Sequence, residues 1–474
     1  MSTPLPAGTA PAMNAQPRKS KAQSIADDLA HAIVSGQYAP GEKLPPHRVM
    51  AKRLGVTAGT VSRAYASLEQ RSLALARVGD GTYVRNLDMG PYGPAHATAP
   101  AMIDLAHNVA MDTGEGQALH QTLIELSRPG NPAAAGLLRY QPEAGMAHHR
   151  AAGAAWLQRQ FGMPGQAERV MVTHGAQHAL AAVLRTVARA GDTILTESLS
   201  YSGMLELARS LRLQVIALEM DDEGLLPQAL DRAARTYGSR MLYCTPSLHN
   251  PTTATMSLAR RRAVATVLKR HKMLLMEDVV HAAAMAEPLP AIASMLPEQS
   301  FLLSSFSKVL APGLRVGYLE ASAPWLDKVA ASIRADCWMV APLLPEILTR
   351  WLVSGRAGEL IAHQRAAIHE RLALATRCLR GLAFRSAPDL PHLYMPLPEP
   401  WTVPQFTAAL RSAGVLVRTM DHFAAGRHAP PNAVRISLNA APTLDVLRQG
   451  LQALASVRHA GVDSTTGQQP LVVG

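Results

Sequence analysis

The sequence predicts two domains of different fold class: a small N-terminal domain, mainly α-helical with a short β-hairpin, and a large α/β domain. Residues 21–86 combine apolar positions at helical spacing with two strand-like runs around a glycine turn. Residues 87–103 are rich in Pro, Gly and Ala, which indicates a linker. Residues 104–458 alternate strand-like apolar runs with helical stretches, a pattern typical of a mostly parallel sheet.

Length and composition indicate a multidomain globular protein. The chain has 474 residues, and its hydrophobic content of 48% is typical of globular proteins. Its cysteines show neither paired nor metal-type spacing, so we expect a reducing, cytoplasmic setting and no metal. No apolar run reaches the roughly 18 residues of a membrane span, so we expect no membrane partner. Residues 1–20 and 459–474 are expected to be flexible tails, and the first lacks the apolar core of a signal peptide.

Residues 21–86 contain the pattern of a helix-turn-helix. A first helix is expected within "KAQSIADDLAHAIVSGQY", a second follows Pro46, and Gly55 makes the turn to a third helix capped by Thr57. The run "ALARVGDGTYVRN" then predicts two strands joined by "GDG", a hairpin or wing. Residues 1–90 carry eleven Lys and Arg against six Asp and Glu, a weak indication of a nucleic-acid partner.

Three motifs in this block, "GEKLPPHR", "LGVTAGTVSRAY" and "GDGTYV", resemble the winged helix-turn-helix of GntR-type bacterial repressors. The resemblance implies that the third helix enters the major groove of a double-stranded DNA operator. It places on phosphates or bases, or close to the DNA backbone, the following residues: Arg48, Thr57, Thr60, Ser62, Arg63 and Gly81. Ala58 and Asp80 depart from the family, which often has basic residues there. A winged helix that binds a protein instead of DNA is the alternative.

In the large domain, polar residues follow five strand-like runs. In open α/β sheets ligands bind just beyond the carboxyl ends of strands, so these residues are expected to form one site. In chain order they are Gly175, Ala176 and Gln177, then Tyr201, then Asn250, then Glu277 and Asp278, and finally Ser305, Ser307 and Lys308.

These groups fit pyridoxal 5′-phosphate (PLP), whose aldehyde needs a lysine for a Schiff base. Beyond residue 100 there are four lysines, and Lys308 is the candidate. Lys269 and Lys272 lie in a basic cluster before a strand, and Lys328 lies in an expected surface helix.

The other polar groups match the remaining parts of the cofactor. Asp278 suits the pyridine nitrogen, which needs an acid to stay protonated, although a helix N-cap is its alternative role. Asn250 suits the phenolic oxygen, and Tyr201 suits a ring face. The phosphate suits a helix N-terminus with hydroxyls and a cation, a set that comprises Gly175, Ala176, Gln177, Ser305, Ser307 and Arg315.

The motifs "GAQ", "HNPT", "ED" and "SFSKVLAPGLRVGY" resemble the fold-type I aminotransferases of the aspartate aminotransferase superfamily. A winged helix ahead of such a domain resembles the MocR subfamily of GntR regulators. The resemblance implies that Arg435 holds a substrate carboxylate, with a plain surface arginine as the alternative, and that Tyr140 and Gly145 lie near the cofactor. The family usually has a tyrosine two or three residues after the aspartate. Val280 and His281 stand there instead, and His281 either replaces that tyrosine or is simply a histidine of the fold.

The resemblance implies a homodimeric, PLP-dependent transcriptional regulator that senses an amine, an amino acid or PLP itself. We expect the aminotransferase-like domain to serve as an effector sensor rather than as an enzyme. Two alternatives stay open: an active aminotransferase with an accessory DNA-binding module, and a dimerisation scaffold without cofactor.

Overall fold

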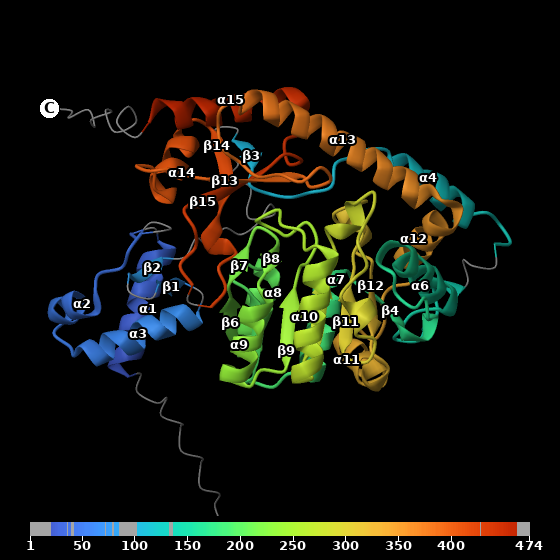
Figure 1. Cartoon of the computed structure of the whole chain (residues 1–474), viewed down its shortest axis with the longest axis horizontal. Coiled ribbons are helices and arrows are strands. Elements are labelled where there is room, and N and C mark those ends of the chain that lie inside the picture. The colour runs from blue at the N-terminus through green and yellow to red at the C-terminus, as the bar shows by residue number, and fades with distance from the viewer. Residues whose placement is uncertain are drawn as a thin grey trace, which may run out of the picture. The chain divides into compact units, whose positions relative to one another are not determined.

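The computed structural model divides the chain into two compact units, Met1–Leu87 and Asp88–Gly474 (Figure 1). The residues that it describes are 20–35, 37–38, 42–71, 73–77, 80–84, 102–131, 136–426 and 428–461. The predicted tails at 1–20 and 459–474 and the predicted linker therefore lie largely outside the described residues. No helix of the described part is both long enough and apolar enough to cross a membrane.

The N-terminal unit is a three-helix domain with a two-stranded antiparallel sheet, as predicted. Its elements are α1 (Lys21–Val34), α2 (His47–Leu54), α3 (Ala58–Gln70), β1 (Ala74–Arg77) and β2 (Gly81–Val84). Gly55 adopts φ +64° and ends α2, and the Thr57 side chain accepts a hydrogen bond from the Thr60 amide and caps α3. Val61, Tyr65 and Leu68 of α3 are buried in the core of this unit.

The large unit is built around a seven-stranded sheet with the order β4-β12-β11-β10-β9-β5-β6. All neighbours are parallel except that β12 runs antiparallel to both β11 and β4, which confirms the mostly parallel prediction. The strands are β4 (Val170–Thr173), β5 (Thr193–Glu197), β6 (Gln214–Leu218), β9 (Met241–Cys244), β10 (Leu274–Asp278), β11 (Ser300–Leu303) and β12 (Gly317–Ala321).

Helices cover both faces of this sheet and give two apolar cores. One face packs on α6 (Ala147–Phe161), α9 (Pro227–Tyr237), α10 (Leu258–His271) and α12 (Leu343–Ser354). The other packs on α7 (Ala176–Val187), α8 (Ser202–Ser210) and α11 (Leu326–Cys337). Because side chains alternate along a strand, Tyr243 faces the second core while its neighbour Cys244 faces the first.

A second sheet has the order β13-β15-β14-β3 and its own core. Its strands are β3 (Ile103–Leu105), β13 (His392–Pro396), β14 (Val415–Thr419) and β15 (Ala433–Ser437), and its helices are α13 (Arg356–Cys378), α14 (Val403–Ser412) and α15 (Leu444–Ala460). The long helix α13 extends from α15 to α12 (Figure 1). The large unit also contains α4 (Glu115–Leu126) and a short hairpin of β7 (Met220–Asp221) and β8 (Gly224–Leu225).

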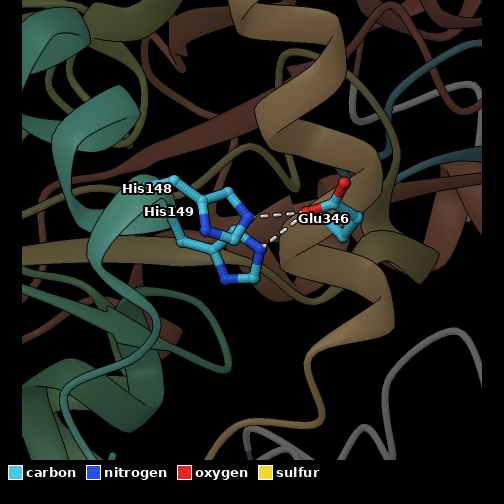
Figure 2. A group of neighbouring side chains, drawn as sticks. All are labelled: His148, His149 and Glu346. Carbon is cyan, nitrogen blue, oxygen red and sulfur yellow. Dashed lines mark hydrogen bonds and ion pairs between the residues drawn. The ribbon is translucent and has the colours of Figure 1, made fainter. Parts of the chain in front are cut away.

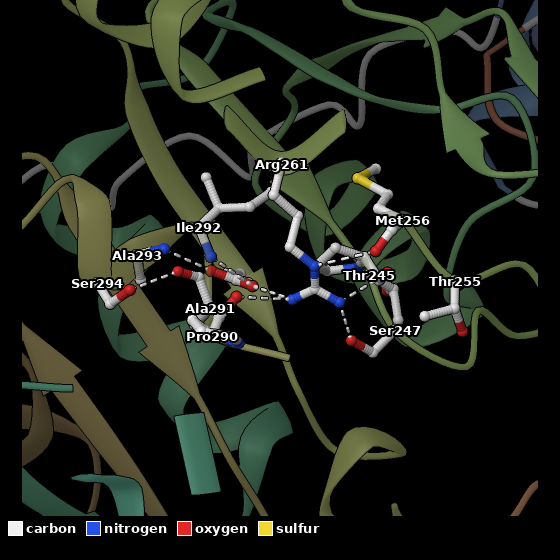
Figure 3. A network of polar contacts seen from close by, with 12 residues as sticks. Thr245, Ser247, Thr255, Met256, Arg261, Pro290, Ala291, Ile292, Ala293 and Ser294 are labelled. Carbon is white, nitrogen blue, oxygen red and sulfur yellow. Dashed lines mark hydrogen bonds and ion pairs between the residues drawn. The ribbon is translucent and has the colours of Figure 1, made fainter. Parts of the chain in front are cut away.

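A buried polar network behind β10 surrounds Arg261 of α10, which is 1% exposed (Figure 3). Its guanidinium donates to the carbonyls of Met256, Pro246 and Pro290 and lies 4.0 Å from the Glu277 carboxylate. That carboxylate accepts hydrogen bonds from the amides of Ile292 and Ala293 at 3.1 and 2.7 Å. Neighbouring side chains of a strand point to opposite faces, so Glu277 belongs to this internal network while Asp278 points to the other face of β10.

We expect Arg261→Met to destabilise the large unit by about 3 kcal/mol or more, because it leaves the Glu277 carboxylate buried without its cation. The neighbouring Arg262 is exposed, so Arg262→Met should change the free energy of unfolding by less than about 0.5 kcal/mol. Urea denaturation followed by circular dichroism would measure both. Equal midpoints for the two variants would contradict a stabilising role of the network.

Candidate functional site

Five strands, β4, β5, β9, β10 and β11, point in one direction, so their carboxyl ends lie along one edge of the sheet. The predicted residues follow these ends: Gly175 caps α7 after β4, Tyr201 caps α8 after β5, Asn250 follows β9, Asp278 ends β10, and Lys308 follows β11. The antiparallel strand β12 begins at this same edge, which brings in Arg315 from just before its first residue.

Gly175, Ser305, Ser307 and Arg315 form one polar cradle at the start of α7. The Arg315 guanidinium donates to Ser307 Oγ at 3.2 Å and to the His174 carbonyl at 3.0 Å, and the two serine hydroxyls are 3.1 Å apart. Gly175 has φ +84°, and a Cβ there would lie 3.3 Å from both Arg315 Nη2 and Ser305 Oγ. An arginine, two hydroxyls and a helix N-terminus are the groups that bind a phosphate.

Gln177 and Tyr201 both lie close to Gly203. The Gln177 amide Nε2 donates to the Gly203 carbonyl at 3.0 Å, whereas its buried Oε1 has no hydrogen-bond partner among the described residues. A Cβ at Gly203 would come within 2.5 Å of the Tyr201 ring, so the ring requires a glycine there. Burial, followed by the charge of Asp278, raises the pKa of Tyr201 to about 12. Tyr201 is therefore a neutral aromatic surface near the aspartate.

Asp278 is held by hydrogen bonds on both carboxylate oxygens. Oδ1 accepts from the Val280 amide at 2.9 Å, and Oδ2 accepts from the Tyr243 hydroxyl at 2.7 Å. Burial raises the pKa of this carboxyl, whereas the two hydrogen bonds lower it. Tyr243 is fully buried on β9, next to β10, and has no counterpart among the predicted site residues. Both oxygens of Asp278 are therefore held in place by hydrogen bonds. In the described chain no α-helix begins directly after Asp278, so the bond from Val280 is not an α-helix N-cap.

The Lys308 amine lies in this cluster and donates to the main-chain carbonyl of Asn108 at 2.7 Å. Its pKa is lowered from 10.5 to about 8, first by burial and then by the charges of Arg435 and Arg315. No carboxylate of the described chain forms an ion pair with it. A lysine with this pKa is partly neutral near physiological pH and can act as a nucleophile.

Arg435, at the centre of β15, is only 5% exposed, so the alternative of a surface arginine is wrong. Its Nη1 donates to Asn250 Oδ1 at 2.9 Å, its Nη2 donates to the Ala106 carbonyl, and its buried Nε has no partner in the described part of the chain. No described carboxylate pairs with it. Burial, then the charge of Arg418, lowers its pKa to about 9, so it remains mainly a cation at neutral pH. A buried cation without a counter-charge favours an incoming anion.

Three buried histidines lie near these cations: His281, which the sequence suggests, and His249 and His392, which it does not. The pKa of His281 falls to about 3 through burial and the charges of Lys308 and Arg435, and that of His249 falls to about 4 through burial. His392 is also kept neutral by burial, and its Nδ1 lies 2.9 Å from the Asn108 amide. The histidines add hydrogen-bonding groups to the site without adding charge.

Tyr140 and Gly145 do not join this cluster within one chain. Tyr140 is 82% exposed and lies beside Trp338, with ring centroids 6.0 Å apart. Gly145 packs on Val172, where a Cβ would come within 2.5 Å of a methyl group. The residues that sequence reasoning missed are Tyr243, Asn108, His249 and His392, whereas His281 is one of its candidates. Of the missed residues, only Tyr243 could have been suspected from the sequence, because it is a polar residue near the end of an apolar strand.

The predicted DNA-binding residues cluster on α2, α3 and β2. Arg48, Ser62 and Arg63 are exposed, and no described acidic residue pairs with either arginine. Ser62 Oγ lies 3.0 Å from His47 Nδ1, while Thr57 and Thr60 share a hydrogen bond of 2.9 Å.

The wing residues Asp80 and Gly81 both contact Lys43. The Asp80 carboxylate accepts hydrogen bonds from Lys43 Nζ and the Tyr83 hydroxyl, each at 2.8 Å, so it holds a lysine at the wing. Gly81 has φ +130°, a backbone conformation that favours glycine, which explains the glycine without reference to DNA.

Comparison with known proteins agrees with both units. Residues 100–454 match the family "Aminotransferase class I and II", and residues 21–84 match "Bacterial regulatory proteins, gntR family". The chain is 28% identical to the HTH-type transcriptional regulator YdeF of Bacillus subtilis over 91% of this chain and 93% of that protein. It is 25% identical to the vitamin B6 salvage pathway transcriptional repressor PtsJ of Salmonella typhimurium over 88% of this chain and 94% of that protein.

The fold also matches that of solved aminotransferases. The α-aminoadipate aminotransferase LysN of Thermus thermophilus, solved in complex with N-(5′-phosphopyridoxyl)-L-leucine, superposes with a TM-score of 0.69 and 21% identity, covering 77% of this chain and 94% of LysN. The chain therefore belongs to the class I and II aminotransferase family and joins such a domain to a GntR-family winged helix, as the MocR transcriptional regulators do.

Proposed function

We propose that this regulator binds PLP through Lys308 and uses its aminotransferase-like domain to sense a small amine or amino acid, or PLP itself. The observation that carries the proposal is the convergence of Lys308, Asp278 and the Gly175–Ser305–Ser307–Arg315 cradle at one sheet edge. When bound, PLP supplies an aldehyde that reacts with amines and a ring that withdraws electrons.

The residues present fit each part of this cofactor. The cradle offers a cation, hydroxyls and the amides of Ala176 and Gln177 to the phosphate, and Asp278 offers its fixed carboxylate to the ring nitrogen. Because Asn250 uses its oxygen to accept from Arg435, its amide is left to donate to the phenolic oxygen. Tyr201 supplies an aromatic surface for the ring. The lowered pKa of Lys308 leaves part of its amine free to react.

The charges around Arg435 indicate an effector that carries an anionic group. Arg435 is a buried cation without a carboxylate partner in the described chain, and His281 and His392 near it are neutral. A carboxylate placed on Arg435 would receive a two-pronged hydrogen bond and would offset this buried positive charge. An amino acid would then bring its amine toward Lys308.

A homodimer is also part of the proposal. Tyr140 and Trp338, which are 82% and 58% exposed, lie beside each other with ring centroids 6.0 Å apart, and nearby in the sequence Leu138 and Leu343 are 92% and 42% exposed. Exposed aromatic pairs of this kind are typical of protein interfaces. A symmetric dimer would pair two winged helices on a repeated or palindromic operator in the cytoplasm.

Transcriptional control requires that the effector bind two arrangements of the protein with different affinity, since a ligand shifts only what it binds differentially. The alternative function is an active aminotransferase with an accessory DNA-binding module, because Lys308, Asp278 and Arg435 together also permit amino transfer. A steady-state assay with amino donors and α-keto acids separates the two: turnover above a few per minute would contradict a domain that acts only as a sensor.

Lys308→Ala should abolish stable PLP retention, because it removes the only covalent bond to the cofactor that we propose and leaves hydrogen bonds and ring contacts alone to hold it. After PLP is added and then removed by desalting, the parent protein should keep the visible absorption of bound cofactor and the variant should lose it. Lys269→Ala, which changes an exposed lysine of α10, should behave like the parent. No retained absorption in the parent would favour the scaffold alternative.

The reactivity of Lys308 should depend on pH with a midpoint near 8, the pKa that burial and two arginines impose. Competitive acetylation of cofactor-free protein at trace reagent concentration, quantified by mass spectrometry, should rise about tenfold per pH unit below that midpoint and then level off. A rise that continues to pH 10, as for an ordinary lysine peptide, would show that the amine is not perturbed.

Arg435→Met should lower the affinity for a carboxylate-bearing effector by about 10-fold or more, because a charged hydrogen bond contributes roughly 1.5–3 kcal/mol to binding. PLP retention should change little, because the phosphate cradle and Lys308 are intact. Absorption changes during titration with a panel of amino acids and matched decarboxylated amines would measure this. If the decarboxylated amines bind the parent protein as tightly as the amino acids, Arg435 is not a carboxylate site.

Arg63→Ala should lower affinity for DNA selected by the protein from a random pool by about 5-fold or more, and should reduce the salt slope by about 1 if the contact is to a phosphate. Arg71→Ala provides the control, because Arg71 follows the far end of α3 and pairs with Asp27 at 2.6 Å. Fluorescence anisotropy at several salt concentrations would measure both. Unchanged binding by Arg63→Ala would favour a protein-binding role for this helix.

A further inference from the structure

A cluster of His148, His149 and Glu346 lies outside the site described above (Figure 2). The two histidines are in the first turn of α6, and Glu346 is in the first turn of α12. Both imidazole Nε2 atoms converge on the same carboxylate oxygen, Glu346 Oε2, at distances of 2.8 and 3.1 Å. These three potential ligand atoms all lie within 4.8 Å of one another.

We propose that this cluster is a binding site for a borderline transition-metal dication such as Zn²⁺ or Co²⁺. Two imidazoles and one carboxylate are a common protein donor set for such ions. With metal–ligand bonds of about 2.0–2.2 Å and tetrahedral angles, neighbouring donor atoms are about 3.3 Å apart. The observed separations of 2.8 and 3.1 Å are shorter by only a few tenths of an ångström, so small side-chain movements would admit the ion.

The carboxylate is prepared to act as an anionic ligand. The Glu346 carboxylate lies within hydrogen-bond distance of the Nε2 atoms of His148 and His149 and accepts a hydrogen bond from Arg350. Arg350 Nε donates to Oε1 at 2.8 Å, which orients the carboxylate and leaves Oε2 toward the imidazoles. The charge of Arg350 is partly offset by Glu125, whose carboxylate lies 3.9 Å away. Glu346 and Glu125 together bring two negative charges against the one positive charge of Arg350, an excess of negative charge that favours a dication.

The burial of the three ligands indicates a site with one open side. The side chains of His149 and Glu346 are 1% and 7% exposed, whereas that of His148 is 51% exposed. Each imidazole would bind the ion through Nε2 as the neutral tautomer that carries its proton on Nδ1, while solvent at the His148 side would supply the remaining ligand. Mg²⁺ and Ca²⁺ are hard cations that prefer oxygen ligands, whereas Zn²⁺ and Co²⁺ bind imidazole nitrogen well. The site should therefore bind zinc or cobalt more tightly than Mg²⁺ or Ca²⁺. The bound ion would tie the start of α6 to α12.

Metal analysis of untagged, full-length protein provides the test. After chelator treatment and equilibrium dialysis against micromolar ZnCl₂ with excess MgCl₂, we expect about one zinc per chain, as one such three-ligand site allows. His148→Ala and Glu346→Gln should each lower zinc affinity by about tenfold or more, because each removes a direct ligand.

His369→Ala is the matched control, because His369 is 50% exposed and also pairs with a carboxylate at 2.8 Å, that of Asp389. It should leave zinc binding unchanged. Absence of zinc from the parent protein would overturn the proposal. Equal zinc binding by His148→Ala would overturn it too, since the ion would then be bound elsewhere. His148→Ala decides the matter if Glu346→Gln fails to fold, because His148 is half exposed.

Discussion

Six strands, β4, β5, β6, β9, β10 and β11, end at one edge of the large sheet, and the arrangement of the site depends on this shared direction. It brings residues more than a hundred positions apart in sequence to one place. The reversed strand β12 completes the set, because it begins where the others end and so delivers Arg315 to the cradle. Gly317, its first residue, permits this close approach, since a Cβ there would lie 2.3 Å from the Ser304 carbonyl.

Two buried arginines show how the fold treats charge differently inside and outside the site. Arg261 has carbonyl acceptors and a glutamate nearby, so its charge is satisfied by the protein. Arg435 is equally enclosed but has one amide oxygen, one carbonyl and no carboxylate among the described residues. Leaving a buried cation without a counter-charge costs stability, and such an arrangement is typical of a site that awaits a ligand.

Much of the fold could be predicted from the sequence, because helix caps, turn glycines and apolar runs are local signals. The strand-end rule also predicted Lys308 and Asp278, and the need for a cation at the phosphate added Arg315. The contacts of Asn108 could not be predicted, because its carbonyl meets Lys308 across 200 positions, and any residue type has a carbonyl. Glu346 likewise meets His148 only through the packing of two helices, and neither the adjacent histidines nor the lone glutamate was a motif.

The two cations that would receive an effector are already engaged by the chain's own backbone. Arg435 donates to the carbonyl of Ala106 and Lys308 to that of Asn108, both just after β3. Strand β3 is the first strand of the large unit. A ligand that takes the position of either carbonyl therefore competes with a contact that holds the segment after β3, so ligand binding and the placement of this segment depend on the same two side chains.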